Sequence, residues 1–232
     1  IRRANSKIRI ICSKETCGRK TNNFRTKRSK LSNKKMIIVG LTGGIGSGKS
    51  TILNYFRERG YPCFESDEVG KKLLEVELKE TVVKLFGEEV YNTKGILDRK
   101  VISKKVFSNS KLLETLNNIV HPAVNEAFEK FKKKYQDSPI IVKEAAILIE
   151  SGSYKSCDII ILVKAPLDER IKRIMARDSA NKSEVIAKIS NQWEDKKKEK
   201  YADYVVENIS IQETHEKVKN LIKKLNNKEN FY

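Results

Sequence analysis

A glycine-rich segment close to residue 45 constrains this chain more than any other part of its sequence. It fits the spacing G-x-x-x-x-G-K-[ST], and its fixed places are taken by Gly43, Gly48, Lys49 and Ser50. The apolar, β-branched run at 36–41 predicts a buried strand before it, and residues 52–59 predict a helix after it. Strand, glycine loop and helix in this order are the context in which the motif binds phosphate.

Each part of this segment has a physical role. Glycines let successive backbone N–H groups approach phosphate oxygens, and the following helix directs its positive end at them. The motif places Lys49 on the β- and γ-phosphates and the Ser50 hydroxyl on Mg²⁺. A glycine-rich turn that binds nothing is the alternative, and the flanking strand and helix weigh against it. The residues expected on the nucleotide are Gly44, Ile45, Gly46, Ser47, Gly48, Lys49, Ser50 and Thr51.

The strong positive charge of the chain is unevenly distributed. The formal net charge is +18, and residues 1–35 hold 13 Lys or Arg against one acid, Glu15. The remaining residues are only mildly basic, as suits an enzyme that handles polyanionic substrates. Three interpretations of 1–35 compete: residues upstream of the true start, which we favour, an organellar presequence, or a nucleic-acid-binding arm. Under the first two interpretations we expect disorder in residues 1–35, followed by one P-loop domain at 36–232.

Cysteines and apolar runs limit the classes of protein further. The four cysteines form no C-x-x-C pair, which argues against a zinc site and a disulfide framework and indicates a reducing compartment. No run approaches 18 consecutive apolar residues, so we expect no membrane partner. These features predict a cytoplasmic protein.

Buried strands alternate with helices along the chain. Strands are predicted at 61–64, 140–142, 158–163 and 204–206, and helices at 68–78, 81–86, 97–107, 111–120, 123–135, 167–176, 183–200 and 211–225. We expect His121-Pro122 to separate two of these helices, and 183–200 to be a helical hairpin or one long helix. The alternation predicts an α/β fold with a parallel sheet covered on both faces. The mostly helical block 68–135 interrupts it, which suggests an inserted substrate-binding region.

Several motifs together resemble the dephospho-CoA kinase family, over residues 36–208. They are GLTGGIGSGKST (40–51), SDEV (66–69), LDR (97–99), IVHP (119–122), EAAILIESG (144–152), ARD (176–178), Gln192 and ADYVVEN (202–208). The resemblance implies ATP-dependent phosphorylation, with Mg²⁺, of the ribose 3′-hydroxyl of dephospho-CoA to give coenzyme A. It also implies a doubly wound sheet with a P-loop and a helical lid at about 177–200.

The resemblance assigns roles to individual residues. It implies catalytic roles for Asp67, Lys49 and Arg177, a nucleotide contact for Asn208, and substrate contacts for Thr42, Arg99, His121 and Glu150. Asp67 or Ser66 alone could instead cap a helix, and Arg173 and the lysines 196–198 are interpreted as solvated. Where the family commonly shows D-A-D, this chain has Glu65-Ser66-Asp67, so only Asp67 carries over. A lysine at 196–200 replaces an arginine common in the family, which weakens the lid assignment.

Two other functions compete with this one. Another nucleoside or nucleotide kinase can use the same loop, and the basic extension suggests a nucleotide-dependent nucleic-acid-binding protein. A GTPase is disfavoured because the chain contains no N-K-x-D: in its three Asn-Lys pairs, the place of the aspartate is taken by Met36, Glu184 and Asn230. We expect no stable nucleic-acid partner.

Overall fold

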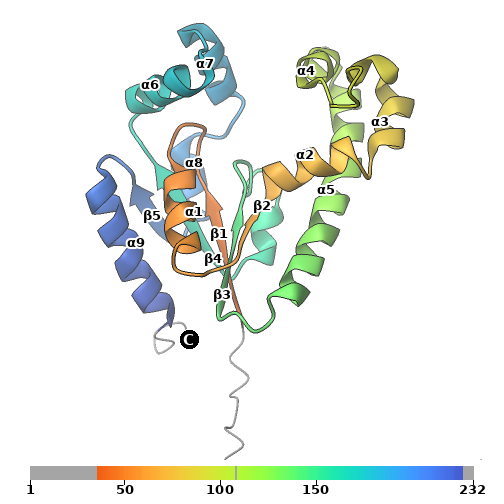
Figure 1. Ribbon diagram of the computed structural model, residues 1–232. Coiled ribbons are helices and arrows are strands. Elements are labelled where there is room, and N and C mark those ends of the chain that lie inside the picture. The colour runs from red at the N-terminus through yellow and green to blue at the C-terminus, as the bar shows by residue number, and fades with distance from the viewer. Residues whose placement is uncertain (1–35, 108, 227–232) are drawn as a thin grey trace, which may run out of the picture. The chain divides into compact units, whose positions relative to one another are not determined.

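The computed structural model describes residues 36–107 and 109–226, and the expectations for residues 1–35 lie outside this range. Its centre is a parallel sheet with strand order β2-β3-β1-β4-β5 (Figure 1). The strands are β1 (Ile37–Thr42), β2 (Cys63–Glu65), β3 (Ile140–Glu144), β4 (Ile159–Lys164) and β5 (Tyr204–Glu207). The predicted α/β fold with a parallel sheet is therefore confirmed.

Helices connect and cover these strands. The α-helices are α1 (Lys49–Arg57), α2 (Ser66–Glu75), α3 (Lys79–Phe86), α4 (Arg99–Phe107), α5 (Ser110–Lys134), α6 (Leu167–Asp178), α7 (Lys182–Ser190), α8 (Asp195–Glu199) and α9 (Ile211–Asn226). Two short 3₁₀ helices are η1 (Glu88–Val90) and η2 (Ser153–Ser156). Among these helices, none is long and apolar enough to span a membrane.

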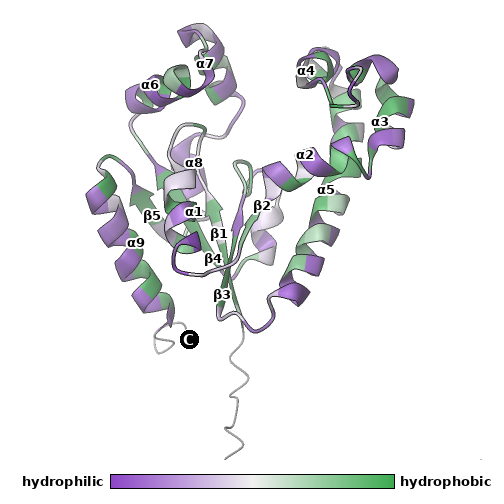
Figure 2. Ribbon diagram, viewed as in Figure 1, coloured by the Kyte–Doolittle hydropathy of each residue, from purple (hydrophilic) through white to green (hydrophobic). Residues whose placement is uncertain are grey.

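The strands are apolar on both faces because each face packs against a different layer. Val39 and Ile161 pack with α1 and α9, through residues such as Phe56 and Leu221. On the other face of the sheet, Ile141 of β3 packs with Phe64 of β2 and Phe128 of α5. Figure 2 shows the strands in green between helices whose outer surfaces are largely purple. Because successive residues of a strand point to opposite faces, a strand that is apolar at consecutive positions is covered on both faces.

Parallel strands end at one edge, and that edge carries the polar residues of interest. The phosphate-binding loop follows β1, Asp67 lies just after β2, Glu144 ends β3, and Asn208 follows β5. Ligands of open α/β sheets bind outside this carboxyl edge.

Two details differ from the sequence expectations. His121-Pro122 does not separate two helices, because α5 continues through Pro122. A proline costs one helical hydrogen bond, but here both halves of α5 are anchored, by Leu116 in one apolar cluster and Phe128 in another. The segment 183–200 is not one long helix, because a turn at 191–194 separates α7 from α8, and the alternative of two helices therefore stands.

Candidate active site

The backbone of the phosphate-binding loop has conformations that require glycine. Gly46 and Gly48 have φ values of 80° and 90°, in the left-handed region. A Cβ on Gly48 would also lie 1.9 Å from the side-chain amide nitrogen of Asn208. That amide donates to the Ser47 carbonyl at 3.0 Å, so Asn208, predicted to contact nucleotide, supports the loop and also lines the cavity beside it.

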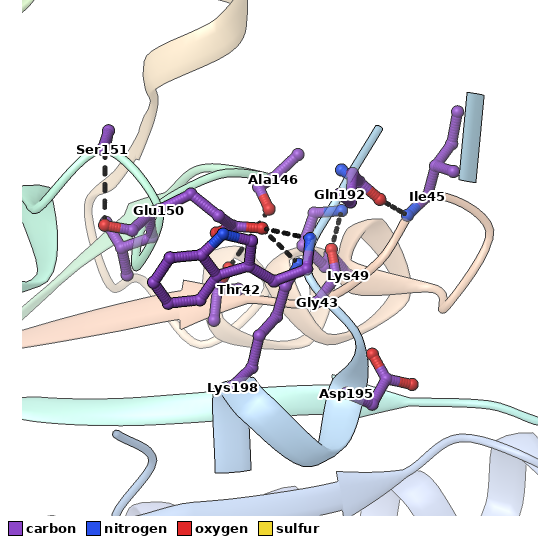
Figure 3. Close-up of polar contacts among 12 residues, drawn as sticks. Thr42, Gly43, Ile45, Lys49, Ala146, Glu150, Ser151, Gln192, Asp195 and Lys198 are labelled. Carbon is purple, nitrogen blue, oxygen red and sulfur yellow. Dashed lines mark hydrogen bonds and ion pairs between the residues drawn. The ribbon is translucent and has the colours of Figure 1, made fainter. Parts of the chain in front are cut away.

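One residue of the loop, Ile45, is held through both its backbone N–H and its carbonyl by residues from α6 and beyond. The Ile45 N–H donates to Gln192 Oε1 at 2.8 Å (Figure 3). The Ile45 carbonyl accepts from Arg170 Nε at 2.9 Å. Arg170 is buried and lies 3.5 Å from an Asp195 carboxylate oxygen. The loop is therefore fixed in part by the segment that was expected to form the lid, to which Gln192 and Asp195 belong.

Lys49 lies between the loop and the end of β3. Its ammonium donates to the Gly43 carbonyl at 3.0 Å and lies 3.8 Å from a Glu144 carboxylate oxygen. Burial raises the pKa of Glu144 to about 7, against the opposing charge of Lys49. Burial also lowers the pKa of Lys49, and Glu144 opposes that change. The carboxyl of Glu144 thus titrates near neutral pH beside the phosphate-binding lysine.

A cavity of about 760 Å³ runs from the loop to Asp67. Its charged lining comprises Lys49, Glu65, Asp67, Glu68, Lys71, Glu144, Arg173 and Arg177. Two buried donors of this region, Ser47 Oγ and Arg173 Nη1, have no hydrogen-bond partner within the described residues. Unpaired buried donors are costly, so their presence beside the loop fits an anionic ligand. Arg173, interpreted from sequence as solvated, is in fact half-buried. Its Nη2 donates to the Asn208 carbonyl at 3.0 Å.

Asp67 lies in the first turn of α2, at the border of this cavity. Its carboxylate accepts from the Ala146 N–H at 3.4 Å. The helix begins at Ser66, and its N-cap residue is Glu65, with no side-chain capping hydrogen bond. Neither Asp67 nor Ser66 is therefore the N-cap that the sequence left open as an alternative.

The other predicted site residues are dispersed. Ser50, Thr51 and Arg177 line the loop cavity, and His121 lines a second cavity beside Asp67. Thr42 is fully buried and donates to the Ala146 carbonyl at 3.4 Å. Arg99 begins α4, and its side chain lies outside the described part of the structure.

Glu150 lines neither the loop cavity nor the second cavity. Its carboxylate is 2.9 Å from the Lys198 ammonium and accepts from the Trp193 N–H at 3.3 Å (Figure 3). The geometry at Lys198 is that of an ion pair rather than of an aligned hydrogen bond. Lys198 is fully buried, so the expectation of a solvated lysine face is wrong at this position, whereas Lys196 and Lys197 are exposed.

Oxygen ligands for a metal are present at the loop cavity. The Ser50 hydroxyl and the carboxylates of Asp67 and Glu144 all line it. Mg²⁺ prefers oxygen ligands and is usually held by few protein groups together with phosphates. Over the described ranges, no cluster of three or more His, Cys, Asp or Glu could hold a metal alone. The donor set therefore fits a metal that enters with a nucleotide.

Comparison with known proteins identifies the family. The sequence profile of the dephospho-CoA kinase (CoaE) family matches residues 37–213. The chain belongs to the dephospho-CoA kinase family. The dephospho-CoA kinase of Chlorobium chlorochromatii is 38% identical over 204 residues, which cover 84% of this chain and 96% of the relative. That of Fusobacterium nucleatum is 36% identical, with 75% and 91% covered.

Solved structures agree on the fold of this kinase family. The protein TT1252 from Thermus thermophilus superposes with a TM-score of 0.75 at 34% identity, covering 82% of this chain and 98% of that one. The dephospho-CoA kinase from Campylobacter jejuni has a TM-score of 0.61 at 23% identity, covering 81% and 96%.

Sequence reasoning missed several residues at the site. The sequence did indicate Glu144 as a site residue, since it follows a buried strand and opens a family motif. Nothing in the sequence indicated that it pairs with Lys49. Arg170 and Arg173 share a helix face with Arg177, yet nothing in the spacing distinguishes the buried from the exposed arginines. The contact of Gln192 with Ile45 spans 147 residues of sequence, beyond any local pattern.

Proposed function

We propose that this chain transfers the γ-phosphoryl group of ATP to the ribose 3′-hydroxyl of dephospho-CoA, giving coenzyme A and ADP. The observation that supports this most is the single cavity that joins the phosphate-binding loop to the Asp67 carboxylate. One end offers donors for phosphate, and the other offers an acceptor for a hydroxyl proton. Family membership supports dephospho-CoA as the hydroxyl substrate.

On the donor side, the loop N–H groups and Lys49 bind the phosphates of ATP. Arg173 Nη1 is a buried donor at this cavity without a partner in the described structure, so we assign it to a phosphate oxygen. Arg177 reaches the transferred group once it leaves Asp178, to which it now donates at 2.7 and 3.0 Å. Positioned cations stabilise the charge that develops during phosphoryl transfer.

Mg²⁺ accompanies the nucleotide in this proposal. Ser50 holds it together with phosphate oxygens, and Asp67 or Glu144 reaches it directly or through water. When bound, the metal neutralises charge on the phosphates.

On the acceptor side, Asp67 orients the ribose hydroxyl and accepts its proton. A carboxylate is a weak base, but a loose transition state requires chiefly alignment of the nucleophile. We assign the helical block 68–135, with His121 and Arg99, to acceptor binding, and 177–200 to a lid over the phosphates. For Thr42 and Glu150, which contact Ala146 and Lys198, we propose support of the site in place of substrate contact.

We include a cytoplasmic location in the proposal, because the cysteine pattern indicates a reducing compartment.

The alternative function is another nucleoside kinase activity. A coupled assay of ADP release decides between the acceptors. We expect release with dephospho-CoA to exceed release with adenosine and nucleoside monophosphates by at least about 10²-fold in kcat/KM, since binding energy of remote groups raises the rate. Equal or faster release with a monophosphate would overturn dephospho-CoA as substrate. A Lys49→Ala variant is the blank for contaminating kinases.

A further inference from the structure

The side chain of Ile45, in the middle of the phosphate-binding loop, packs into an apolar cluster formed by α6 and α7. The buried members of this cluster are Ile171, Ile174 and Val185, and Ile45 is half-buried against them. Every member other than Ile45 lies between residues 171 and 189. The two helices lie side by side (Figure 1). One side chain of the loop is therefore part of the packing of the helices that lead into the lid.

The backbone on either side of Ile45 lies directly against α6. A Cβ on Gly44 would lie 2.1 Å from a guanidinium nitrogen of Arg170. A Cβ on Gly46 would lie 2.7 Å from the Arg170 carbonyl oxygen and 2.9 Å from Ile174 Cδ1. Atoms that are not bonded do not approach so closely, so both positions require glycine. The loop therefore contacts α6 through three consecutive residues, with Ile45 at the centre.

Both backbone hydrogen-bonding groups of Ile45 are directed at the same region of the chain. Its N–H donates to Gln192 Oε1 (Figure 3), and its carbonyl accepts from Arg170 Nε. A backbone N–H has one proton to donate, so this N–H does not reach a phosphate oxygen while it is bound to Gln192. The side chain, the N–H and the carbonyl of Ile45 thus all contact the segment 170–192.

Helix α6 carries two arginines of the loop cavity beyond its contact with Ile45. Arg173 and Arg177 follow Arg170 by about one and two helical turns, and both line the cavity. At about 1.5 Å per residue, Arg177 lies about 10 Å further along the helix axis than Arg170. A change in the tilt of α6 at Ile45 therefore moves both guanidinium groups. A misplacement of about 1 Å costs on the order of 10²-fold in rate.

We propose that Ile45 is a positioning residue, which holds α6 so that Arg173 and Arg177 are aligned with the phosphates bound by the loop. Its N–H stays on Gln192 and does not bind phosphate. The inference rests on the proposed function, because it requires that the arginines of α6 act on the transferred group. It differs from the expectation of a nucleotide contact at Ile45, which followed from the loop motif.

The first test truncates the side chain and leaves the backbone of the loop intact. We expect Ile45→Ala to lower kcat by about tenfold and to change the dissociation constant of ADP by less than about twofold, because the loop donors remain. Ile45→Val keeps a β-branched side chain in the cluster and should recover most of kcat. Ile209→Ala, at a residue that is 59% exposed outside the lid, is the matched control and should change neither quantity.

A second test asks whether Ile45 acts through the arginines. In the background Arg173→Ala/Arg177→Ala, the further change Ile45→Ala should lower single-turnover transfer by less than about twofold, because the groups that it aligns are absent. A full, additive loss in that background would show that Ile45 acts on the loop itself and would overturn the proposal. A lower Tm of Ile45→Ala with wild-type kcat would make the residue structural only, which also overturns it.

A third test follows the Ile45 amide directly by NMR and needs no acceptor. When ADP is added to the wild type, the Ile45 amide resonance should move less than those of Gly48 and Lys49. Gln192→Met removes the acceptor oxygen and should speed hydrogen exchange of the Ile45 amide by about tenfold or more. An ADP-induced shift at Ile45 as large as that at Lys49 would place its N–H on phosphate and overturn the proposal. If the wild type failed to phosphorylate dephospho-CoA, the proposed function would fall, whereas the result with ADP alone would still decide the role of the Ile45 N–H.

Discussion

Asp67 belongs to both cavities and, although it lies in the first turn of α2, does not cap that helix. These two facts favour a role in transfer over a structural one. Its neighbour across the loop cavity, Glu144, has a different environment, since its burial raises its pKa to about 7. The roles of Asp67 and Glu144 are therefore tested separately.

For Asp67→Asn, we expect a loss of kcat on the order of 10², the usual range for a general base, with ATP affinity retained. Single-turnover transfer and nucleotide binding are measured in the same preparation. Asp168→Asn, also in the first turn of a helix, is the matched control and should leave transfer unchanged. Transfer near the wild-type rate in Asp67→Asn would move the search for the base to Glu144.

For Glu144→Gln, the prediction concerns the pH dependence of stability. The folded protein keeps a proton on Glu144 up to about pH 7, whereas the unfolded chain loses it near the ordinary value of 4.5. Wild-type stability therefore falls relative to the variant as pH rises through this interval, by about 3 kcal/mol at most. Urea unfolding at about pH 5 and about pH 8 measures this difference.

The control for that experiment is Glu126→Gln on α5. Lys130 holds the pKa of Glu126 below its usual value of 4.5, so its contribution is already present at about pH 5, and the stability difference between the wild type and this variant should stay nearly constant up to about pH 8. If the Glu144 variant showed the same constant difference over this interval, the raised pKa of Glu144 would be refuted.

At the scale of elements, α6 presents arginines with different surroundings to the phosphate-binding loop. Arg170 is buried and donates to the Ile45 carbonyl, Arg173 is half-buried at the loop cavity, and Arg177 is exposed and donates to Asp178. Helix α6 is thus anchored at one end and reaches the cavity with the other.

Arg177→Ala should lower kcat by about tenfold or more with little change in KM, if the arginine acts only on the transferring group. Arg173→Ala should also raise KM for ATP, because its donor faces the phosphates before transfer. Steady-state kinetics of both variants, with exposed Lys172→Ala as control, separate these effects. Unchanged kcat in both would leave α6 as a support for the loop alone.

The element after α7 is held by the buried pair of Glu150 and Lys198. Lys198→Met leaves a carboxylate uncompensated, and we expect a loss of about 3–5 kcal/mol in unfolding free energy. The double variant Glu150→Gln/Lys198→Met should recover part of that loss, and exposed Lys196→Met should cost little. Urea unfolding of the wild type, of Glu150→Gln and Lys198→Met as single variants, and of the double variant gives the coupling energy, and additive losses would contradict the pairing.

Across the described part of the molecule, β1 is the central strand of the sheet. It begins at Ile37, whose N–H donates to the Pro139 carbonyl at 3.0 Å, and its register partners lie in β3 and β4. Both neighbours of β1 therefore come from the described range, and we expect the kinase domain to fold from residue 36 onward.

Deleting residues 1–35 should change Tm by no more than about 2 °C and leave ADP release unchanged, since a 1 kcal/mol loss shifts Tm by about 2–4 °C in a domain of this size. Thermal unfolding and the coupled assay check this. A truncated protein that is insoluble or inactive would assign these residues to the fold or to the site.

The sequence by itself determined the fold class and the phosphate-binding loop, because both follow from short-range patterns. Apolar strands that alternate with helices indicate a sheet covered on both faces, and the spacing from Gly43 to Ser50 indicates the phosphate-binding loop. Asp67 followed from the same logic, since a residue just after a parallel strand must lie at the ligand edge.

Only the tertiary structure decided which charged side chains are buried and what they contact. Lys198 and Lys196 are both lysines of one short charged run, yet one is fully buried and the other exposed. Their difference depends on Glu150, which is distant along the chain, just as the Ile45 contact depends on Gln192. Such pairs arise when separate strands and helices pack together, and no local periodicity encodes them. The physical reason is that burial is a property of the packed assembly, whereas strand and helix periodicity is a property of the segment itself.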